Sequence, residues 1–291
     1  MWSPASVRII KIVFAFVLLF AFVLDHTLLV AADKTAATVV VKDALTSPNQ
    51  AVTIEAKLIG KGLVASRALG GEPLDLVIDG KVVASAMTGG DGRAFLTYIP
   101  TAKGIKLVRV RVGQSPRVDH AEGQAHLVVW EKRQPILMIE LASLMEISPP
   151  SRVPTIGLGP ESGGKPMSEA ADELEKLTRF YYGVIYVAPL PSGGDGFRVS
   201  TEVGEWLKLH KFPAGYVLPL SADMKGLGEK IDEFQEAGWK TVKIGIGRSK
   251  AFAEAFLQRR LDAIMVPEPS KGDVPRKAQV AKDWKDVRKK L

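Results

Sequence analysis

The sequence predicts two folded parts: an all-β sandwich over residues 33–132, then an α/β domain with a parallel sheet over residues 133–270. Short β-rich segments separated by turn residues fill the first part, which is typical of an antiparallel sandwich. From Pro135 onward, apolar strand-like segments alternate with helical segments, and this order predicts a parallel sheet covered by helices on both faces. With 291 residues, of which 46% are hydrophobic, the chain is long enough to build a core in each part.

The N-terminus has the pattern of a secretory signal peptide. Two basic residues, Arg8 and Lys11, precede the apolar run Ile12–Leu24, and small residues follow before Asp33. This pattern predicts that residues 1–32 direct export to the periplasm or the cell surface and are then cleaved. An uncleaved membrane anchor is the alternative, although a spanning helix needs about 20 apolar residues and this run ends after 13.

Cysteine content and charge narrow the class of protein. The chain contains no cysteine, which excludes disulfides, cysteine metal ligands, a cysteine nucleophile and an acylated lipoprotein cysteine. An exported chain without disulfides fits a bacterial extracytoplasmic protein better than a eukaryotic secreted one. The formal net charge is +7, but residues 271–291 hold eight Lys/Arg and three Asp, so most of the excess lies in this tail. No nucleic-acid-binding motif accompanies it, and we exclude nucleic acid as a partner.

In the first part, we expect about seven strands. Leu74–Ile78 alternates in polarity, Asp79 and Gly80 form a two-residue hairpin turn, and Gly89–Gly92 forms the next turn. In order, the expected strands are Thr38–Lys42, Ala51–Ile59, Leu74–Ile78, Lys81–Met87, Arg93–Ile99, Lys106–Val112 and Ala125–Trp130.

The turn residues of this part carry a resemblance. Gly71-Glu72-Pro73, Asp79-Gly80 and Asp91-Gly92-Arg93 stand in the order in which bacterial immunoglobulin-like repeats mark successive strands. The first part is therefore similar to a bacterial immunoglobulin-like domain, which implies two packed antiparallel sheets. Asp79 and Asp91 are also candidate Ca²⁺ ligands, but turn geometry is the preferred interpretation of both.

The second part alternates strands and helices. The expected strands are Ile136–Ile139, Val184–Val187, Gly215–Leu218, Thr241–Gly247 and Asp262–Val266, and the expected helices are Ser168–Phe180, Thr201–His210, Gly226–Ala237 and Lys250–Gln258. The Pro-rich residues 147–154 and the Gly-rich residues 157–164 are expected to be loops at the ligand edge of the sheet.

Residues 271–291 form a basic C-terminal segment with a helix over Arg276–Leu291. Val280, Trp284, Val287 and Leu291 make one apolar stripe on this helix. We expect the stripe to dock on a domain. A membrane-surface helix or a partner-binding helix is the alternative.

The stretch Tyr186–Leu220 resembles part of a known enzyme family. A strand runs through a Pro/Gly-rich loop into a helix, and Lys211–Gly215 ends that helix before another apolar strand. This order, with Ile246–Ser249 after a later strand, resembles the lipin and actin-patch phosphatidate phosphatase branch of the haloacid dehalogenase (HAD) superfamily over Pro135–Val266. The resemblance implies a phosphatase fold in which an Asp nucleophile, a second Asp two residues on and Mg²⁺ act together.

The positions that correspond to the family's catalytic residues lack the required carboxylates. Ile139 and Leu141 take the places of the aspartate pair in one register, and Glu140 takes the nucleophile's place in the other, with no acid two residues on. Ala188 replaces the hydroxyl residue of the second motif, and Arg248 replaces a metal-binding Asp. Because an arginine at that position repels a cation, we expect no catalytic residue, no metal site and no cofactor.

Three further assignments follow from the resemblance. The family's lysine corresponds to Lys225 or Lys230, and both are candidate anion-binding residues, although a lysine on a helix is usually at the solvated surface. Arg248 and Ser249, at a strand-to-helix junction, are candidate ligands of an anion such as a phosphate head group. The preferred interpretation is that both cap the following helix.

An active phosphatase would need acidic residues other than those of the family's motif. The remaining route is a site made by Glu140 with Asp172 or Glu161, with Mg²⁺ as cofactor. We regard this as the alternative to an inactive domain.

Other catalytic patterns are not found in the sequence. His120, His126 and His210 lack metal-ligand spacing, and the Gly-rich residues 157–164 are not followed by a P-loop Lys-Ser/Thr pair. No serine stands in a G-x-S-x-G context.

We therefore expect an exported two-domain protein with an inactive HAD-like phosphatase domain, acting in binding or scaffolding, with a protein or a phosphate-bearing ligand as its partner. The alternative is an active phosphatase of phosphatidate or another phosphoester. A third hypothesis is a structural surface protein in which the sandwich is the working part.

Overall fold

The computed structural model describes residues 34–62, 66–146, 164–190, 194–270 and 272–291. The expected signal peptide, residues 1–32, and most of the expected loops over residues 147–164 lie outside the described residues. In the described part of the chain, no helix is long and apolar enough to cross a membrane.

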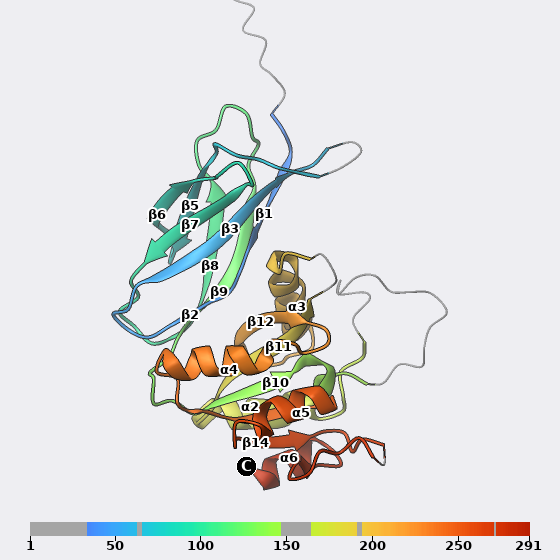
Figure 1. Cartoon of the computed structure of the whole chain (residues 1–291). Helices are drawn as coiled ribbons and strands as arrows, with labels where there is room; N and C mark the ends of the chain where they lie inside the picture. The colour runs from blue at the N-terminus through green and yellow to red at the C-terminus, as the bar shows by residue number, and fades with distance from the viewer. Residues whose placement is uncertain (1–33, 63–65, 147–163, 191–193, 271) are drawn as a thin grey trace, which may run out of the picture.

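The first part of the described chain folds into two β-sheets, here called the sandwich (Figure 1). All strand pairs in it are antiparallel except the parallel pair β2–β9. One sheet contains β1 (Ala37–Val41), β3 (Val52–Gly60), β4 (Arg67–Ala68) and β7 (Arg93–Tyr98), and the other has the order β2 (Ala44–Thr46), β9 (Glu122–Val129), β8 (Gly104–Val112), β5 (Pro73–Ile78) and β6 (Lys81–Met87).

The seven expected strands are confirmed, with their ends moved by up to three residues. Alternating residues of β8 explain why they could be predicted: Val108, Val110 and Val112 are buried in the core between the sheets, and the residues between them face outward. Asp79 and Gly80 both have positive φ angles, 51° and 79°, as a type I′ hairpin turn requires. The short strands β2 and β4 were not predicted, because two or three residues are too few to show alternation.

The second part, here called the α/β unit, is built on a six-stranded parallel sheet. The strand order is β12 (Tyr216–Ser221), β11 (Gly183–Leu190), β10 (Ile136–Glu140), β13 (Val242–Gly247), β14 (Asp262–Met265) and β15 (Gln279–Val280). The helices are η1 (Leu141–Leu144, 3₁₀), α2 (Ala170–Phe180), α3 (Phe197–Leu209), α4 (Leu227–Glu236), α5 (Lys250–Leu257) and α6 (Trp284–Lys290).

Both faces of the parallel sheet are covered, as predicted. On one face, Leu137 and Ile139 pack with apolar residues of α2, α3 and α6, Trp206 and Trp284 among them. On the other face, residues of β10 such as Met138 pack with residues of α4 and α5. Because β10 is central and buried on both faces, all five of its residues are buried.

The C-terminal segment differs from the prediction. A continuous helix over Arg276–Leu291 is wrong, because β15 adds a sixth strand to the sheet and α6 begins only at Trp284. Asp283 fixes that start, since its side chain accepts a hydrogen bond from the backbone N–H of Asp286. Asp262–Val266 is therefore not the last strand.

The docking of the apolar stripe is confirmed for two of its residues. Trp284 and Val287 are fully buried in the core of the α/β unit. The indole N–H of Trp284 donates to the carbonyl of Ser143 at 3.1 Å, and Arg288 pairs with Glu173 of α2 at 2.7 Å. The segment is thus part of the α/β unit.

Candidate functional site

The carboxyl edge of the parallel sheet brings three of the predicted site residues together. β10 ends at Glu140, and β13 leads through Gly247 to Arg248 and Ser249. The Glu140 side chain is 3% exposed. One of its oxygens, Oε2, accepts hydrogen bonds from the backbone N–H groups of Arg248 at 2.6 Å and Ser249 at 2.8 Å.

Gly247 is required for this arrangement. A Cβ atom at this position would lie 2.8 Å from Glu140 Oε2 and 2.4 Å from the ring of Phe252. The Ser249 hydroxyl caps α5, as preferred from the sequence, because it accepts from the backbone N–H of Phe252 at 3.2 Å. The buried carboxylate therefore lies against the N-terminus of α5, where backbone N–H groups favour a negative charge.

The Arg248 side chain is held by the chain itself. Its guanidinium donates to the backbone carbonyl of Met145 and lies 3.7 Å from the sulfur of Met167. Burial lowers the pKa of the Arg248 guanidinium, and the charge of Glu140 opposes that effect. Among the described atoms, Arg248 Nε is buried without a hydrogen-bond partner.

The other motif positions at this edge are apolar core. Ile139, Leu141 and Ala188 are at most 1% exposed and belong to the cluster that packs under α2, α3 and α6. The Ser143 hydroxyl donates to the carbonyl of Glu140 at 2.7 Å and so holds the η1 turn.

The remaining sequence candidates do not join Glu140. Lys225 pairs with Asp223 at 3.0 Å, and Lys230 pairs with Glu233 at 2.6 Å. Asp172 lies in the first turn of α2, and no hydrogen bond described for the chain links it to Glu140; Glu161 lies outside the described residues. In the part of the chain that is described, no group of three or more His, Cys, Asp or Glu residues is placed to hold a metal ion.

A second polar centre, at the joint between the sandwich and the α/β unit, was not predicted. Asp43 follows β1, and its side chain is 2% exposed. Its carboxylate accepts from the backbone N–H of His126 in β9 at 2.8 Å and from that of Val217 in β12 at 3.1 Å. Burial raises the pKa of Asp43 to about 6, and the neighbouring His126 opposes that rise.

The ring of Phe197 forms another part of this joint. Phe197 opens α3, is fully buried, and lies against three cations of the sandwich. Lys42 Nζ is 4.4 Å, Arg93 Cζ 5.6 Å and Lys57 Nζ 5.8 Å from the ring centroid. Cation–π contacts of this kind favour a fixed position of α3 against the sandwich.

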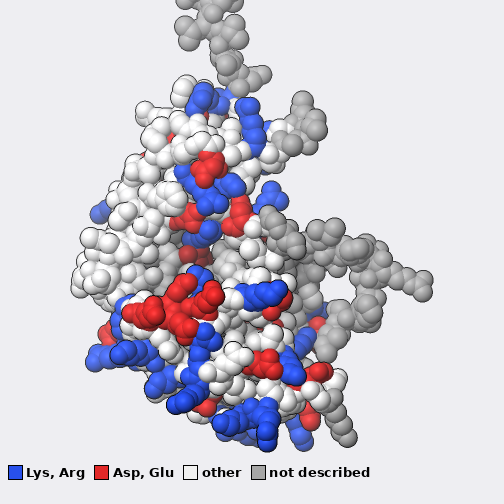
Figure 2. Space-filling view, in the orientation of Figure 1, with Lys and Arg blue, Asp and Glu red and all other residues white. Residues whose placement is uncertain are grey.

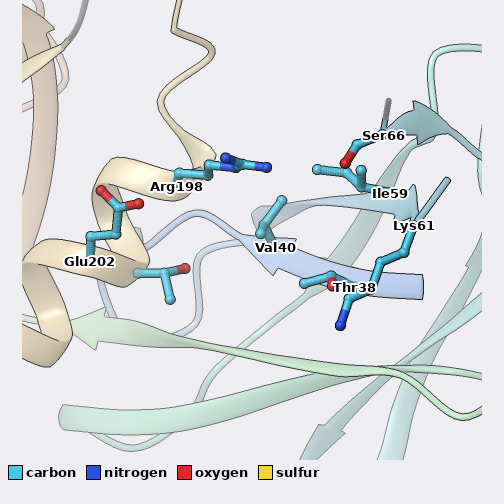
Figure 3. Close-up of a pocket in the computed structure, with 8 residues that line it drawn as sticks. Thr38, Val40, Ile59, Lys61, Ser66, Arg198 and Glu202 are labelled. Atoms are coloured by element: carbon cyan, nitrogen blue, oxygen red, sulfur yellow. The ribbon is translucent and has the colours of Figure 1, made fainter. Parts of the chain in front are cut away.

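A groove lies beside this joint, between the outer face of β1 and β3 and the first turns of α3 (Figure 3). We call it the α3 groove; its volume is about 300 Å³. It is lined by Thr38, Val40, Ile59, Lys61, Ser66, Arg198, Thr201 and Glu202. The groove could not be predicted from the sequence, because residues 38–66 and residues 198–202, which line it, are more than 130 residues apart in the chain.

Comparison with known proteins gives distant likenesses. No protein-family model and no curated protein matches the chain. Among solved structures, a D,D-heptose 1.7-bisphosphate phosphatase from B. bronchiseptica, complexed with magnesium and phosphate, matches with 11% identity and a TM-score of 0.41, covering 54% of this chain and 98% of the other.

Other solved structures match a smaller share of the chain. The D0-D1 domain of intimin matches with 18% identity and a TM-score of 0.22, covering 31% of this chain and 48% of the other. Titin domains z1z2, in complex with telethonin, match with 17% identity and a TM-score of 0.24, covering 37% and 58%. The neighbours thus include a HAD-family phosphatase and immunoglobulin-like domains, at similarities that carry no conclusion about activity.

Proposed function

We propose that this chain is an exported, non-catalytic binding or scaffolding protein in which a HAD-like α/β domain is joined to an immunoglobulin-like sandwich. The observation that carries the proposal is the buried Glu140 carboxylate at the N-terminus of α5. In α/β sheets, ligands bind outside the carboxyl ends of the strands, and helix N-terminal N–H groups are the donors that a phosphate uses. Here the protein's own carboxylate accepts from those donors and would repel a phosphate.

The surroundings of Glu140 also argue against acid chemistry. Catalysis by a carboxylate pair needs two acids that reach the substrate, and a metal site needs several oxygen ligands. Glu140 is buried, its sequence neighbours Ile139 and Leu141 are apolar core, and Arg248 brings a positive charge. The described residues of this edge therefore hold one buried acid beside a guanidinium.

A phosphatase assay with a matched variant tests the proposal. The full chain and its Glu140→Gln variant are incubated with p-nitrophenyl phosphate and Mg²⁺, Mn²⁺ or Co²⁺. Glutamine is a close control because both backbone hydrogen bonds end on the same oxygen of Glu140, so an amide oxygen can accept both. We expect no turnover above buffer for either protein. Turnover by the natural chain that Glu140→Gln abolishes would instead establish the active phosphatase.

Export is tested separately. The signal-peptide pattern of residues 1–32 motivates it. When the full chain is expressed in a bacterium, we expect intact-mass spectrometry of the periplasmic fraction to show a chain that begins near Asp33. Recovery of the chain from the cytoplasm with Met1 still attached would contradict export.

A further inference from the structure

The α3 groove combines an apolar floor with two cations. Val40 is 8% exposed and Ile59 is half-buried, and both lie on the outer face of their sheet. Arg198, in the first turn of α3, extends across the groove over Val40 toward Ile59 (Figure 3). Lys61 enters from the other side and extends toward Thr38 (Figure 3).

Arg198 does not pair with the acid nearest to it on its own helix. Glu202 lies one turn further along α3, at the spacing at which ion pairs form on a helix. In Figure 3 the Arg198 guanidinium extends across the groove while the Glu202 carboxylate stays beside the helix, and no ion pair described for this chain includes Arg198, Glu202 or Lys61. An arginine N-terminal to a glutamate is also the weaker order for such a pair.

Three other cations at the joint are paired with acids. Charges of both signs gather where the sandwich meets the α/β unit (Figure 2). Lys57 pairs with Asp195 at 2.6 Å, and Lys42 pairs with Glu55 at 2.7 Å. Arg93 lies 3.3 Å from the same Glu55. In the α3 groove, by contrast, the cations lie over apolar surface, and no ion pair among the described residues includes them.

The start of α3 is compensated by Asp195, whose carboxylate accepts from the backbone N–H of Phe197 at 3.3 Å. α3 has 13 residues and no acidic residue in its first turn, where Arg198 lies. The N-terminal end of a helix carries a partial positive charge that falls off within one turn. Because the Asp195 carboxylate already lies at that end, an anion in the groove would gain from the Arg198 guanidinium and not from the helix.

We propose that the α3 groove binds a small anion with an apolar body, such as an aliphatic carboxylate or an aliphatic phosphate monoester. The anion pairs with the Arg198 guanidinium, whose two parallel N–H groups match either head group, and Lys61 adds a second charge. The aliphatic body covers Val40 and Ile59. A volume of about 300 Å³ is at the lower end of ligand pockets, which limits the body to a short chain. The proposal goes beyond the non-catalytic function and does not depend on it.

Nuclear magnetic resonance of the ¹⁵N-labelled full chain tests this site. The chain is titrated with hexanoate, with hexyl phosphate and with 1-hexanol, which has the same body without the charge. We expect saturable shifts of the backbone amide signals of Val40, Ile59 and Arg198 with at least one of the anions, and affinity at least about tenfold lower for 1-hexanol. Comparing the two anions shows which head group the groove prefers.

Two arginine variants complete the experiment. Arg198 is exposed, so Arg198→Gln leaves the core intact, and we expect it to lower the affinity for the preferred anion by about tenfold or more. Arg179→Gln is the matched control, because Arg179 lies on α2 outside the groove and pairs with Glu175. Shifts that do not saturate, equal binding of 1-hexanol, or unchanged affinity in Arg198→Gln would each overturn the proposal.

Discussion

The buried carboxylate of Asp43 makes the stability of this protein depend on pH in a defined direction. Burial raises its pKa to about 6, from 3.8 when unperturbed. The folded chain therefore holds this proton more tightly than the unfolded chain does. The stability that this group contributes is fully present below about pH 4, and it is lost as the pH rises through about 6.

The magnitude follows from the two pKa values. One pKa unit corresponds to 1.36 kcal/mol, so a difference of about two units amounts to roughly 3 kcal/mol in the free energy of unfolding. At pH 4.5 the carboxyl of the unfolded chain is still mostly ionised. Lowering the pH from 7 to 4.5 should therefore raise the free energy of unfolding by about 2 kcal/mol. The groups that face Asp43 are His126 and Tyr216. Burial raises the pKa of Tyr216 to about 12, so it stays neutral in this range.

Asp43→Asn isolates the effect. Urea unfolding followed by tryptophan fluorescence gives the free energy of unfolding of both proteins at pH 4.5, 5.5, 6.5 and 7.5. We expect the natural protein to gain about 2 kcal/mol relative to the variant on going from the highest to the lowest pH. The variant itself is less stable, because an amide presents an N–H group to one of the two backbone donors, at a cost of about 1–3 kcal/mol.

Asp79→Asn is the control for changing an acid to an amide. Asp79 is exposed, and asparagine tolerates its positive φ angle. The free energy of unfolding of Asp79→Asn should change with pH in the same way as that of the natural protein. Parallel pH dependence of the natural protein and Asp43→Asn would refute the reasoning from burial.

Substitutions at three positions of the α/β unit have expected effects on urea unfolding at neutral pH. Ser249→Ala removes the cap of α5 and should cost about 1 kcal/mol, whereas Ser249→Thr, which can still cap without adding a charge beside Glu140, should keep most of the stability; equal stability of both would contradict the cap. Gly247→Ala places a Cβ against the ring of Phe252 and should cost about 1–3 kcal/mol; no loss would contradict the close approach. Trp284→Phe keeps most of the apolar burial but leaves the carbonyl of Ser143 without its indole donor, at about 1–3 kcal/mol. Unchanged stability of that variant would mean that the indole hydrogen bond contributes nothing.

The sheet elements could be predicted because their signals are local. In β8, the alternation of buried valines with exposed residues follows from the strand period of two. The helices of the α/β unit begin and end near turn residues. Helix α3 starts at Phe197, four residues before the predicted start. Gly196 is its N-cap residue, and Asp195 accepts from the backbone N–H of Phe197. The predicted C-terminal helix was too long because Val280 fits the apolar spacing of a helix. In the structure Val280 pairs with Met265 as part of a strand.

The candidate site was predicted as separate positions and not as an arrangement. The sequence identified Glu140, Arg248 and Ser249 as residues at motif positions that lack the expected acids. The pairing of β10 with β13, in which Ile139 lies beside Ile246, brings the Glu140 carboxylate to the two backbone donors. Arg248 was a candidate anion ligand from its motif position, and in the structure its guanidinium donates to the carbonyl of Met145 and its backbone N–H to Glu140.

By itself the sequence determined that a β part precedes an α/β part, where most strands and helices lie, and that no aspartate pair stands at the phosphatase-like positions. Those features depend on residues close together in the chain. Only the tertiary structure decided the roles of Asp43 and Arg198, because their surroundings come from distant segments. Asp43 accepts from Val217, 174 residues away, and Arg198 reaches over a strand of the sandwich. Such contacts arise when two folded surfaces pack, and no local pattern in the chain encodes them.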